Sequence, residues 1–351
     1  MLNVCLTFDY ELFFGENYYS PDDVLFQPTD CLIKLLEKSG VSATFFVDIC
    51  SYIRSKELGQ EDYASNFEKQ IRDMLLHGQD VQLHIHPHWY DSTIDEGKWH
   101  FSNKRYRLQQ FEKKDEEGLN CNYIISDCLL NLEKIAKTVD PSYQCIAFRA
   151  GGFCFQPHSE IAKALISRGI KVDSSIPLMT SCSSTTNNYD YKKKLPYVNW
   201  HISPEEDWWE DSNQESLYEI PIGTETKNIP LFLFRRAFAP NTIKIKKNIK
   251  GSFMKSDQLL SQSLSSKILD YLLGYNLLSL DSYRAGFLFS QLKRFKRKHD
   301  CSKKDSSIAI IGHPKLIDAL YLENLKRFIG FVNDDRNIKL ESIVDAYKGD
   351  N

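Results

Sequence analysis

Short apolar runs alternate with segments of helical periodicity along the first half of the chain. The runs are rich in β-branched and aromatic residues, which predicts strands at residues 2–8, 42–47, 81–86, 145–149 and 170–174. Between the runs, apolar residues recur every three or four positions. This spacing predicts a helix capped by Thr29 and further helices at residues 67–76, 122–139 and 161–167.

The second half of the chain continues the pattern at wider intervals. Residues 217–222 and 306–313 predict two more strands, and residues 320–331 predict a helix. Long polar or basic stretches interrupt these elements. We interpret three of them as insertions, at about residues 89–120, 179–216 and 235–300. We therefore expect residues 1–351 to form a single domain with polar loop insertions and one basic helical insertion.

The order of the elements predicts the fold class and the place of a site. Strands that alternate with helices indicate an α/β fold with a parallel sheet or barrel, covered on both faces where the strands are continuously apolar. In such folds reactive side chains gather at the carboxyl ends of the strands. The notable polar residues of this chain stand at those ends: Asp9, Asp48, residues 84–88, Arg149, Asp173 and His313.

Composition narrows the classes of function and the compartment. The net charge of −3 gives no general signature of polyanion binding, so we expect no nucleic-acid partner. The first residues predict a strand rather than a signal peptide, and no apolar stretch reaches the roughly 18 residues of a spanning helix. Nine cysteines without CxxC spacing are expected to be reduced thiols. These features indicate a cytoplasmic protein.

Three imidazoles lie within five residues at the end of the third predicted strand: His84, His86 and His88. Neutral imidazole is the commonest metal ligand, and catalytic zinc takes three nitrogen or oxygen ligands from the protein. His84 and His86 share a face if the strand continues. If Pro87 ends the strand, a tight loop brings His88 back to His84 instead. Both pairs stay open, and a surface histidine cluster is the alternative to a metal site.

Three further strand ends carry groups suited to hydrolysis. Asp9 and Glu11 are two residues apart, so that one carboxylate can bind a metal while the other takes a proton from water. Arg149 can keep a carboxylate ionised, or form an ordinary structural ion pair. His313 ends a buried strand before a proline, and it can give a proton to a leaving amine or be a core histidine.

Together these residues resemble the polysaccharide deacetylase superfamily, also called the NodB-homology family or carbohydrate esterase family four. The motifs follow the family's order: Thr-Phe-Asp from residue 7, histidines at 84 and 88, an arginine turn at 149 and His-Pro at 313. The run Ala-Thr-Phe-Phe-Val at 43–47 is similar to the family's second strand. The resemblance extends to residue 314 and is looser after residue 180. It implies a distorted (β/α) barrel that holds a divalent metal, usually zinc.

The resemblance also implies roles for individual residues. Asp9 resembles the family's catalytic base, Arg149 the arginine that orients the base, and His313 the general acid. The two histidine ligands of the family correspond to His84 and His88.

One position departs from the family's commonest pattern, in which a second aspartate follows the first and binds the metal. Here Tyr10 occupies that place and Glu11 comes next. The longer side chain of Glu11 can reach the same point, so we expect Glu11 to be the third ligand. The alternatives are that His86 completes the metal shell or that the metal site has been lost.

Three other residues are candidates for contact with a substrate. Trp89 follows the histidines, and aromatic faces stack on the apolar faces of sugar rings. Asp48 ends the second predicted strand. Asp173 ends the fifth, where it can pair with His313 and tune its pKa, or be a structural residue.

Residues 235–299 differ in charge from the rest of the chain. They carry 14 Lys and Arg against three Asp, a net charge of +11. Basic residues cluster at both ends of the segment, and the apolar residues between them follow helical spacing. A basic amphipathic helix is typical of contact with an anionic membrane surface or with phosphate-bearing ligands. The alternative is a helical insertion with a solvated basic face.

These patterns lead to one main hypothesis and two alternatives. We expect a metal-dependent hydrolase that removes an N-acyl group, N-acetyl first of all, from an amino sugar in a polysaccharide or in a lipid- or nucleotide-linked sugar precursor. One alternative is a catalytically impaired barrel that binds carbohydrate or a partner protein, which the departure at Tyr10 and Glu11 favours. The other is hydrolysis of a C–N bond in a non-sugar amide.

Overall fold

A nine-stranded sheet forms the centre of the computed structural model. The structure describes residues 1–14, 20–101, 105–111, 119–184, 186–226, 274–282, 284–299, 301 and 305–350. The strands of the sheet are β1 (Leu2–Tyr10), β2 (Thr44–Asp48), β3 (Asp80–Ile85), β6 (Ala147–Ala150), β7 (Val172–Asp173), β10 (Trp200–Ile202), β11 (Leu217–Glu219), β14 (Ser306–Gly312) and β15 (Ile338–Glu341). Their order is β10-β11-β7-β6-β3-β2-β1-β14, with β15 also paired to β1. All neighbours are parallel except β10 and β11.

The sheet curls until its two ends meet. Ile222, three residues beyond β11, forms a parallel bridge with Ala309 of β14. The Gly223 N–H donates to the Ala309 carbonyl and the Ala309 N–H donates to the Pro221 carbonyl, both at 2.9 Å. Because a short bridge rather than a full strand pair joins β14 to the segment after β11, the barrel is distorted, and the predicted fold class is confirmed.

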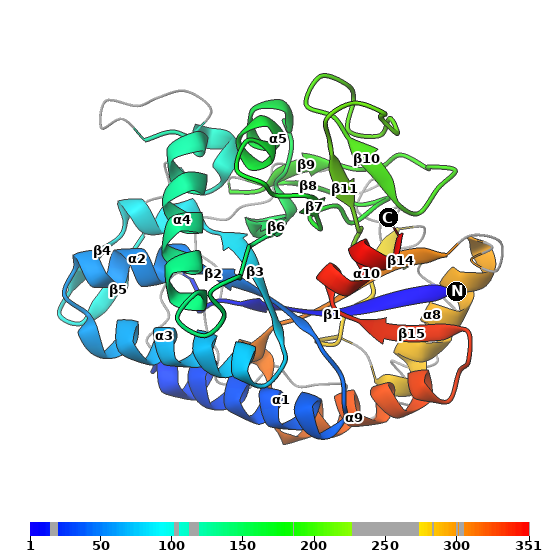
Figure 1. Cartoon of the computed structure of the whole chain (residues 1–351), viewed down its shortest axis with the longest axis horizontal. Helices are drawn as coiled ribbons and strands as arrows, with labels where there is room; N and C mark the ends of the chain where they lie inside the picture. Colours follow the sequence, from blue (N-terminus) through cyan, green and yellow to red (C-terminus); the bar gives the residue numbers. More distant parts are fainter. Residues whose placement is uncertain are drawn as a thin grey trace.

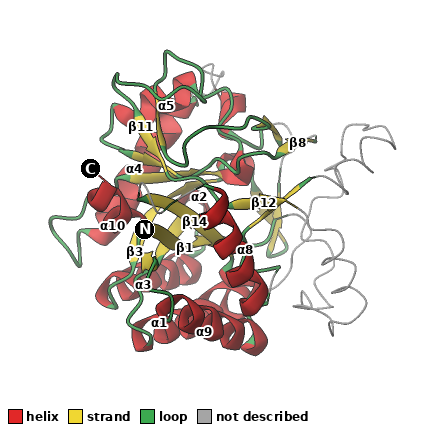
Figure 2. Ribbon diagram, turned by 90° about the vertical axis from the view of Figure 1, so that its right-hand side faces the viewer, coloured by secondary structure: helices red, strands yellow, loops and turns green. Residues whose placement is uncertain are grey.

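Helices cover the outside of the curled sheet (Figure 1). They are α1 (Gln27–Lys38), α2 (Ile49–Glu57), α3 (Glu61–Leu76), α4 (Cys121–Ala136), α5 (Ser159–Ile166), α8 (Ala285–Lys298), α9 (Ala319–Asn333) and α10 (Ile343–Asp350). In Figure 1 and in the turned view of Figure 2, α1, α3 and α9 lie along the same side of the strands. The predicted helices correspond to α1, α3, α4, α5 and α9, whereas α2, α10 and β15 were not predicted.

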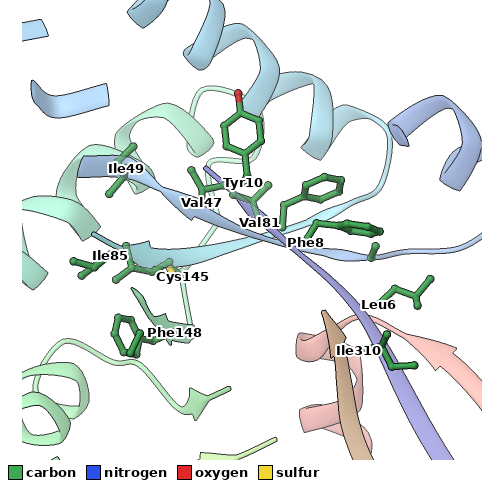
Figure 3. Close-up of a cluster of buried hydrophobic side chains, with 14 of the residues drawn as sticks. Leu6, Phe8, Tyr10, Val47, Ile49, Val81, Ile85, Cys145, Phe148 and Ile310 are labelled. Carbon is green, nitrogen blue, oxygen red and sulfur yellow. The ribbon is translucent and has the colours of Figure 1, made fainter. Parts of the chain in front are cut away.

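The two-residue period of the strands separates an outer core from the barrel interior. Alternate residues of β1, among them Leu6, Phe8 and Tyr10, pack outward against the helices. Figure 3 shows Leu6 beside Ile310 and Tyr10 beside Val47. The intervening residues face inward, and Cys5 belongs to a smaller cluster inside the barrel. By the same two-residue period, Asp9 and Glu11 also face the inner side of the barrel.

The three expected insertions have different outcomes. Residues 93–100 form the hairpin of β4 (Thr93–Asp95) and β5 (Lys98–His100), and the strands β8 (Ser181–Ser183) and β9 (Asn188–Asp190) pair antiparallel. The prediction of surface loops at 179–216 was wrong in part, because Trp200 and Trp208 are buried in the core. The strands β12 (Thr224–Thr226) and β13 (Tyr275–Leu277) pair antiparallel in another small sheet.

The basic insertion is described only in part. Its first cluster, at residues 244–250, lies outside the described residues, and its second cluster lies on α8. Within the ranges given above, no helix combines the length and the apolar character needed to cross a bilayer.

Candidate active site

A cavity of about 550 Å³ opens at the carboxyl ends of the barrel strands. Asp9 and Glu11 reach it from β1, His84 from β3 and His313 from the end of β14. This is the edge at which the strand pattern predicts reactive residues. Loops and hairpins form much of the rest of the wall, which includes five aromatic side chains: Phe13, Phe14, Tyr106, Phe153 and Tyr189.

Glu11, His84 and His86 form a buried cluster whose ligand atoms all lie within 4.8 Å of one another. Glu11 Oε2 is 2.5 Å from His86 Nε2 and 3.3 Å from His84 Nε2. The two imidazole Nε2 atoms are 3.0 Å apart. One carboxylate and two imidazoles form a donor set that suits a catalytic zinc ion, which then keeps an open position.

The structure brings His84 together with His86 and not with His88, contrary to the pair implied by the family resemblance. The reason is the strand period: the inward direction of His84 recurs at His86, because the chain remains extended until Pro87 begins a short 3₁₀ turn, η2 (Pro87–Asp91). That turn carries His88 away from the cluster. Its ring stacks on Tyr106 at 4.3 Å, and neither of its buried nitrogens has a hydrogen-bond partner among the residues that the structure describes.

The hydrogen bonds around the two imidazoles test how well the cluster fits a metal. His84 Nδ1 lies 2.8 Å from the Arg149 carbonyl, so it carries the proton and leaves the Nε2 lone pair toward the cluster. His86 Nδ1 instead accepts from the Arg107 guanidinium at 2.8 Å. A guanidinium only donates, so the proton of neutral His86 lies on Nε2. Neutral His84 therefore fits without a change of hydrogen bonds. Burial lowers its pKa, but Asp9 and Glu11 outweigh burial and raise the pKa, so a bound metal must displace a second proton from this ring. His86 fits once the hydrogen bond to Arg107 is released.

Asp9 lies between this cluster and His313. Its Oδ1 accepts from Arg149 Nη1 at 2.6 Å, while its Oδ2 lies 3.9 Å from His84 Nε2 and 3.8 Å from His313 Nε2. Arg149 is itself fixed, because its Nε and Nη2 donate to the carbonyl and hydroxyl of Ser174. The arginine thus orients Asp9, as the resemblance implies.

The partner of His313 is Asp281, which was not among the residues predicted from the sequence. Asp281 Oδ2 lies 2.7 Å from His313 Nδ1, and Asp281 Oδ1 accepts from the His313 main-chain N–H at 3.1 Å. Of the two alternatives left open for Asp173, pairing with His313 and a structural role, the structural role agrees with its contacts. Asp173 belongs to β7 and accepts from the Ser175 hydroxyl at 2.6 Å, deep in the core.

Burial and charge act in opposite directions on these groups. Burial raises the pKa of Asp9, but the charge of Arg149, followed by His84 and His313, outweighs burial and holds the pKa below its usual value. Burial lowers the pKa of His313, but Asp281 outweighs that effect and raises it. Asp9 is therefore kept as a carboxylate and His313 is favoured as an imidazolium, the forms that a base and an acid need.

Burial and charge also act on the pKa values of the candidate metal ligands. Burial raises the pKa of Glu11, but Lys315 and His86 outweigh it and hold the pKa well below the usual range. For His86 burial prevails and lowers the pKa to about 3, so this imidazole is neutral. Neutral imidazole and ionised carboxylate are the forms that bind metals.

None of the three candidate substrate contacts lines the cavity. Asp48 and Trp89 do not line the cavity, and both are buried. Asp48 Oδ2 accepts from the Trp89 indole at 2.7 Å and Asp48 Oδ1 from the His86 main-chain N–H at 3.3 Å. This aspartate thus fixes the start of the turn after His86. Asp173, the third candidate, also lies away from the cavity.

Sequence reasoning missed Asp281, Lys315 and Arg107. Lys315 Nζ donates to Glu11 Oε1 at 2.6 Å, and Arg107 contacts His86 as described. Asp281 does follow an apolar run, residues 277–280, which is the pattern that pointed to the other strand ends. Lys315 and Arg107 follow no such run, so only the folded chain identifies them.

Among known proteins, several solved structures are similar to this chain. No family profile matches it, and neither does any curated protein. A structure from Mycobacterium smegmatis assigned as a polysaccharide deacetylase is 11% identical, with 99% of this chain and 89% of that chain covered and a TM-score of 0.48. One from Pseudomonas aeruginosa PAO1, similarly assigned, has 11% identity, 99% and 90% coverage and a TM-score of 0.49. An allantoinase has 10% identity, 99% and 89% coverage and a TM-score of 0.49. Polysaccharide deacetylases are thus among the solved structures that this chain resembles.

Proposed function

We propose that this chain is a divalent-metal-dependent hydrolase that removes an N-acyl group, N-acetyl first of all, from an amino sugar. The observation that carries the proposal is the position of Asp9. Its carboxylate is fixed by Arg149, and its second oxygen lies 3.9 Å from His84 and 3.8 Å from His313. A base is thus flanked by a metal-binding cluster on one side and an acid on the other.

Glu11, His84 and His86 would hold the cation, and we propose Zn²⁺ because this donor set suits it. A divalent cation bound there acidifies water and polarises the acyl oxygen. His88, which the family resemblance implies as a ligand, is not part of the proposed set because its ring stacks in the aromatic pocket beside Tyr106.

The chain's own residues carry the proton transfers. Asp9 takes a proton from the attacking water, since Arg149 keeps its carboxylate ionised. His313 gives a proton to the departing sugar nitrogen, and acetate and a free amine are the products. Arg149 and Asp281 are positioning residues, because they act through Asp9 and His313.

The test is acetate release from N-acetylglucosamine oligomers by the full chain with zinc or after treatment with EDTA. We expect release that depends on zinc, and a loss of at least about 100-fold in Asp9→Asn with zinc retained, the range for a general base. Asp62→Asn, an exposed change on α3, is the matched control and keeps full activity.

The alternatives predict different results in the same experiment. If the chain binds no zinc and releases no acetate, the result supports the alternative of a non-catalytic barrel. A zinc-loaded chain that opens the cyclic amide hydantoin but leaves the sugars intact is the non-sugar hydrolase. Acetate release that Asp9→Asn leaves unchanged would falsify the role given to Asp9.

Three further points stay predictions. They are the carrier of the sugar (a polysaccharide or a lipid- or nucleotide-linked precursor), contact with an anionic membrane surface, and the cytoplasmic compartment. On α8, Arg294 and Lys298 pair with buried Glu225 at 2.9 and 3.4 Å, which favours a structural role for part of the basic cluster. Sedimentation with anionic vesicles at low salt tests the membrane contact, and no co-sedimentation would remove it.

A further inference from the structure

Arg107 places a buried cation on the cavity wall, and the described residues give it no opposite charge. The residue is 6% exposed, and it lines the cavity beside Phe153 and Tyr189. Its Nε donates to the Asn187 side-chain oxygen at 2.6 Å and its Nη1 donates to His86 Nδ1 at 2.8 Å. Both acceptors are neutral. No carboxylate among the described residues lies within ion-pair distance of this guanidinium.

The other charges around the cavity differ from Arg107 because each has its own partner. Asp9 pairs with Arg149, Glu11 with Lys315, and Asp281 with His313. Arg107 is therefore the charge that the described part of the site leaves uncompensated. A buried ionised group is costly unless it is paired, so a ligand that supplies a negative charge gains the interaction that the protein does not provide.

The guanidinium also has donors to offer. Of its five N–H groups, the two named hydrogen bonds use one each. The ring of Tyr106 lies 4.5 Å below it, and Asn187 fixes its Nε edge. At Gly152, with φ of +59°, an added Cβ would lie 2.6 Å from Arg107 Nη2, so the turn after β6 leaves room for the guanidinium only as glycine. Asn187 and Tyr106 hold the guanidinium in place, and its hydrogen bond to His86 is the contact that is released when His86 binds a metal.

We propose that the cavity takes an amino sugar that carries an anionic group, a phosphate or a carboxylate, and that Arg107 binds this group. The inference rests on the proposed function, since it names the class of sugar bound at the same site. Arginine suits both anions because its planar fork forms paired, charge-assisted hydrogen bonds. Arg107 is thus the residue that determines specificity for a charged sugar over a neutral one.

The test compares three probes of one size class: N-acetylglucosamine, N-acetylglucosamine 1-phosphate and N-acetylmuramic acid. Calorimetric titration uses the zinc-loaded full chain in the Asp9→Asn form, which does not turn the sugars over. We expect at least one charged probe to bind about 10-fold or more tightly than the neutral sugar, the range for hydrogen bonds to a charged group. Arg107→Gln added to that chain should abolish the preference. The phosphate and carboxylate probes tell which anion is preferred.

Arg105→Gln is the matched control, because Arg105 lies on the same segment but pairs with Asp91 and does not line the cavity. It should keep the preference. If Arg107→Gln loses its folded circular dichroism spectrum, Arg107→Lys replaces it and should keep only part of the preference. In the active chain, Arg107→Gln should raise KM for the preferred charged sugar about 10-fold, and the ratio of kcat/KM for that sugar to kcat/KM for the neutral sugar should fall by about the same factor.

Equal affinity of all three probes, or a preference that survives Arg107→Gln, overturns the inference. So does the absence of any binding that depends on Arg107, including binding of inorganic phosphate. Failure of the proposed function looks different: anion binding would still depend on Arg107, but no sugar would lose its acyl group.

Discussion

A spacing of two residues decides which histidines meet. His84 and His86 face the same side because β3 keeps its extended period up to Pro87, whereas His88 lies beyond the turn and packs against Tyr106. Sequence alone left both pairs open, because whether a strand continues through the residue before a proline depends on what the next residues can pack against. Here Asp48 holds the main chain of His86, a contact from β2 that no local pattern contains.

This difference predicts the zinc content of two variants. His86→Ala removes a ligand and should weaken zinc binding at least 100-fold, more than the 10- to 100-fold loss typical of outer-shell changes. His88→Phe keeps an aromatic ring against Tyr106 and should retain one zinc ion per chain. The metal content after dialysis, measured by mass spectrometry, checks both. Zinc lost from His88→Phe and kept by His86→Ala would reverse the assignment.

The pairing of Asp281 with His313 predicts a change in the pH profile. Asp281 favours protonated His313 and raises its pKa, and the acid role needs that proton. In Asp281→Asn the pKa falls, so the alkaline fall in kcat should begin at lower pH, by about one unit or more for the loss of a neighbouring charge. Rates measured between pH 5 and 10 check this. An alkaline limb at the wild-type pH would exclude Asp281 as the group that tunes His313.

At the scale of elements, the strand ends were predictable and the loops were not. Asp9, Arg149 and His313 each follow an apolar run, and a parallel sheet places such ends at one edge, so the sequence alone indicated that they meet. Arg107 and Lys315 come from a loop and a short 3₁₀ turn, η5 (Pro314–Leu316), whose positions depend on contacts with distant segments. The residues at the strand ends were thus predictable, but the two cationic residues Arg107 and Lys315 were not.

Two neighbouring strands bury a carboxyl pair with a measurable effect on stability. Asp173 of β7 faces Glu219 of β11 in register. Burial raises the pKa of Asp173 to about 6 and raises that of Glu219 well above its usual value. A carboxyl group whose pKa is raised by folding stabilises the fold below its unfolded pKa, and this contribution is lost as pH rises through the folded pKa.

Glu219→Gln should therefore make the free energy of unfolding less dependent on pH. The amide can still donate to Asp173, but it no longer has a proton to lose. We expect the decrease in stability from pH 6 to pH 9 to be smaller than in the wild type, measured by urea denaturation. Glu323→Gln, a change at an exposed position of α9, serves as control. An equal decrease in Glu219→Gln and the wild type would show that the pair does not titrate in this range.

At the scale of the whole molecule, the candidate ligands join parts of the chain that are far apart in sequence. Glu11 follows β1, whereas His84 and His86 belong to the end of β3, with β2 between the two strands. An ion bound by these residues binds the folded chain and not the unfolded one. The barrel was predictable from its alternating elements, but its closure through Ile222 and Ala309 was not, because it is only a short bridge beyond β11.

Zinc should therefore raise the melting temperature of the entire chain. At 100 times the dissociation constant, a ligand specific for the native state adds about 2.7 kcal/mol, which corresponds to several degrees. Differential scanning calorimetry with zinc and with EDTA measures the shift. His84→Ala should remove it, while His77→Ala, an exposed change at the end of α3, should keep it. A shift of the same size in His84→Ala would assign the stabilising ion to another place.

Residue 149 serves two neighbours through different parts of itself. Its carbonyl accepts from His84, and its guanidinium donates to Asp9. A side-chain exchange leaves the carbonyl untouched, so an Arg149→Met chain should load zinc normally while its turnover slows by orders of magnitude. This single substitution should therefore separate zinc binding from turnover. A crystal structure of that chain soaked with an acylated sugar should show the bound sugar before its acyl group is hydrolysed.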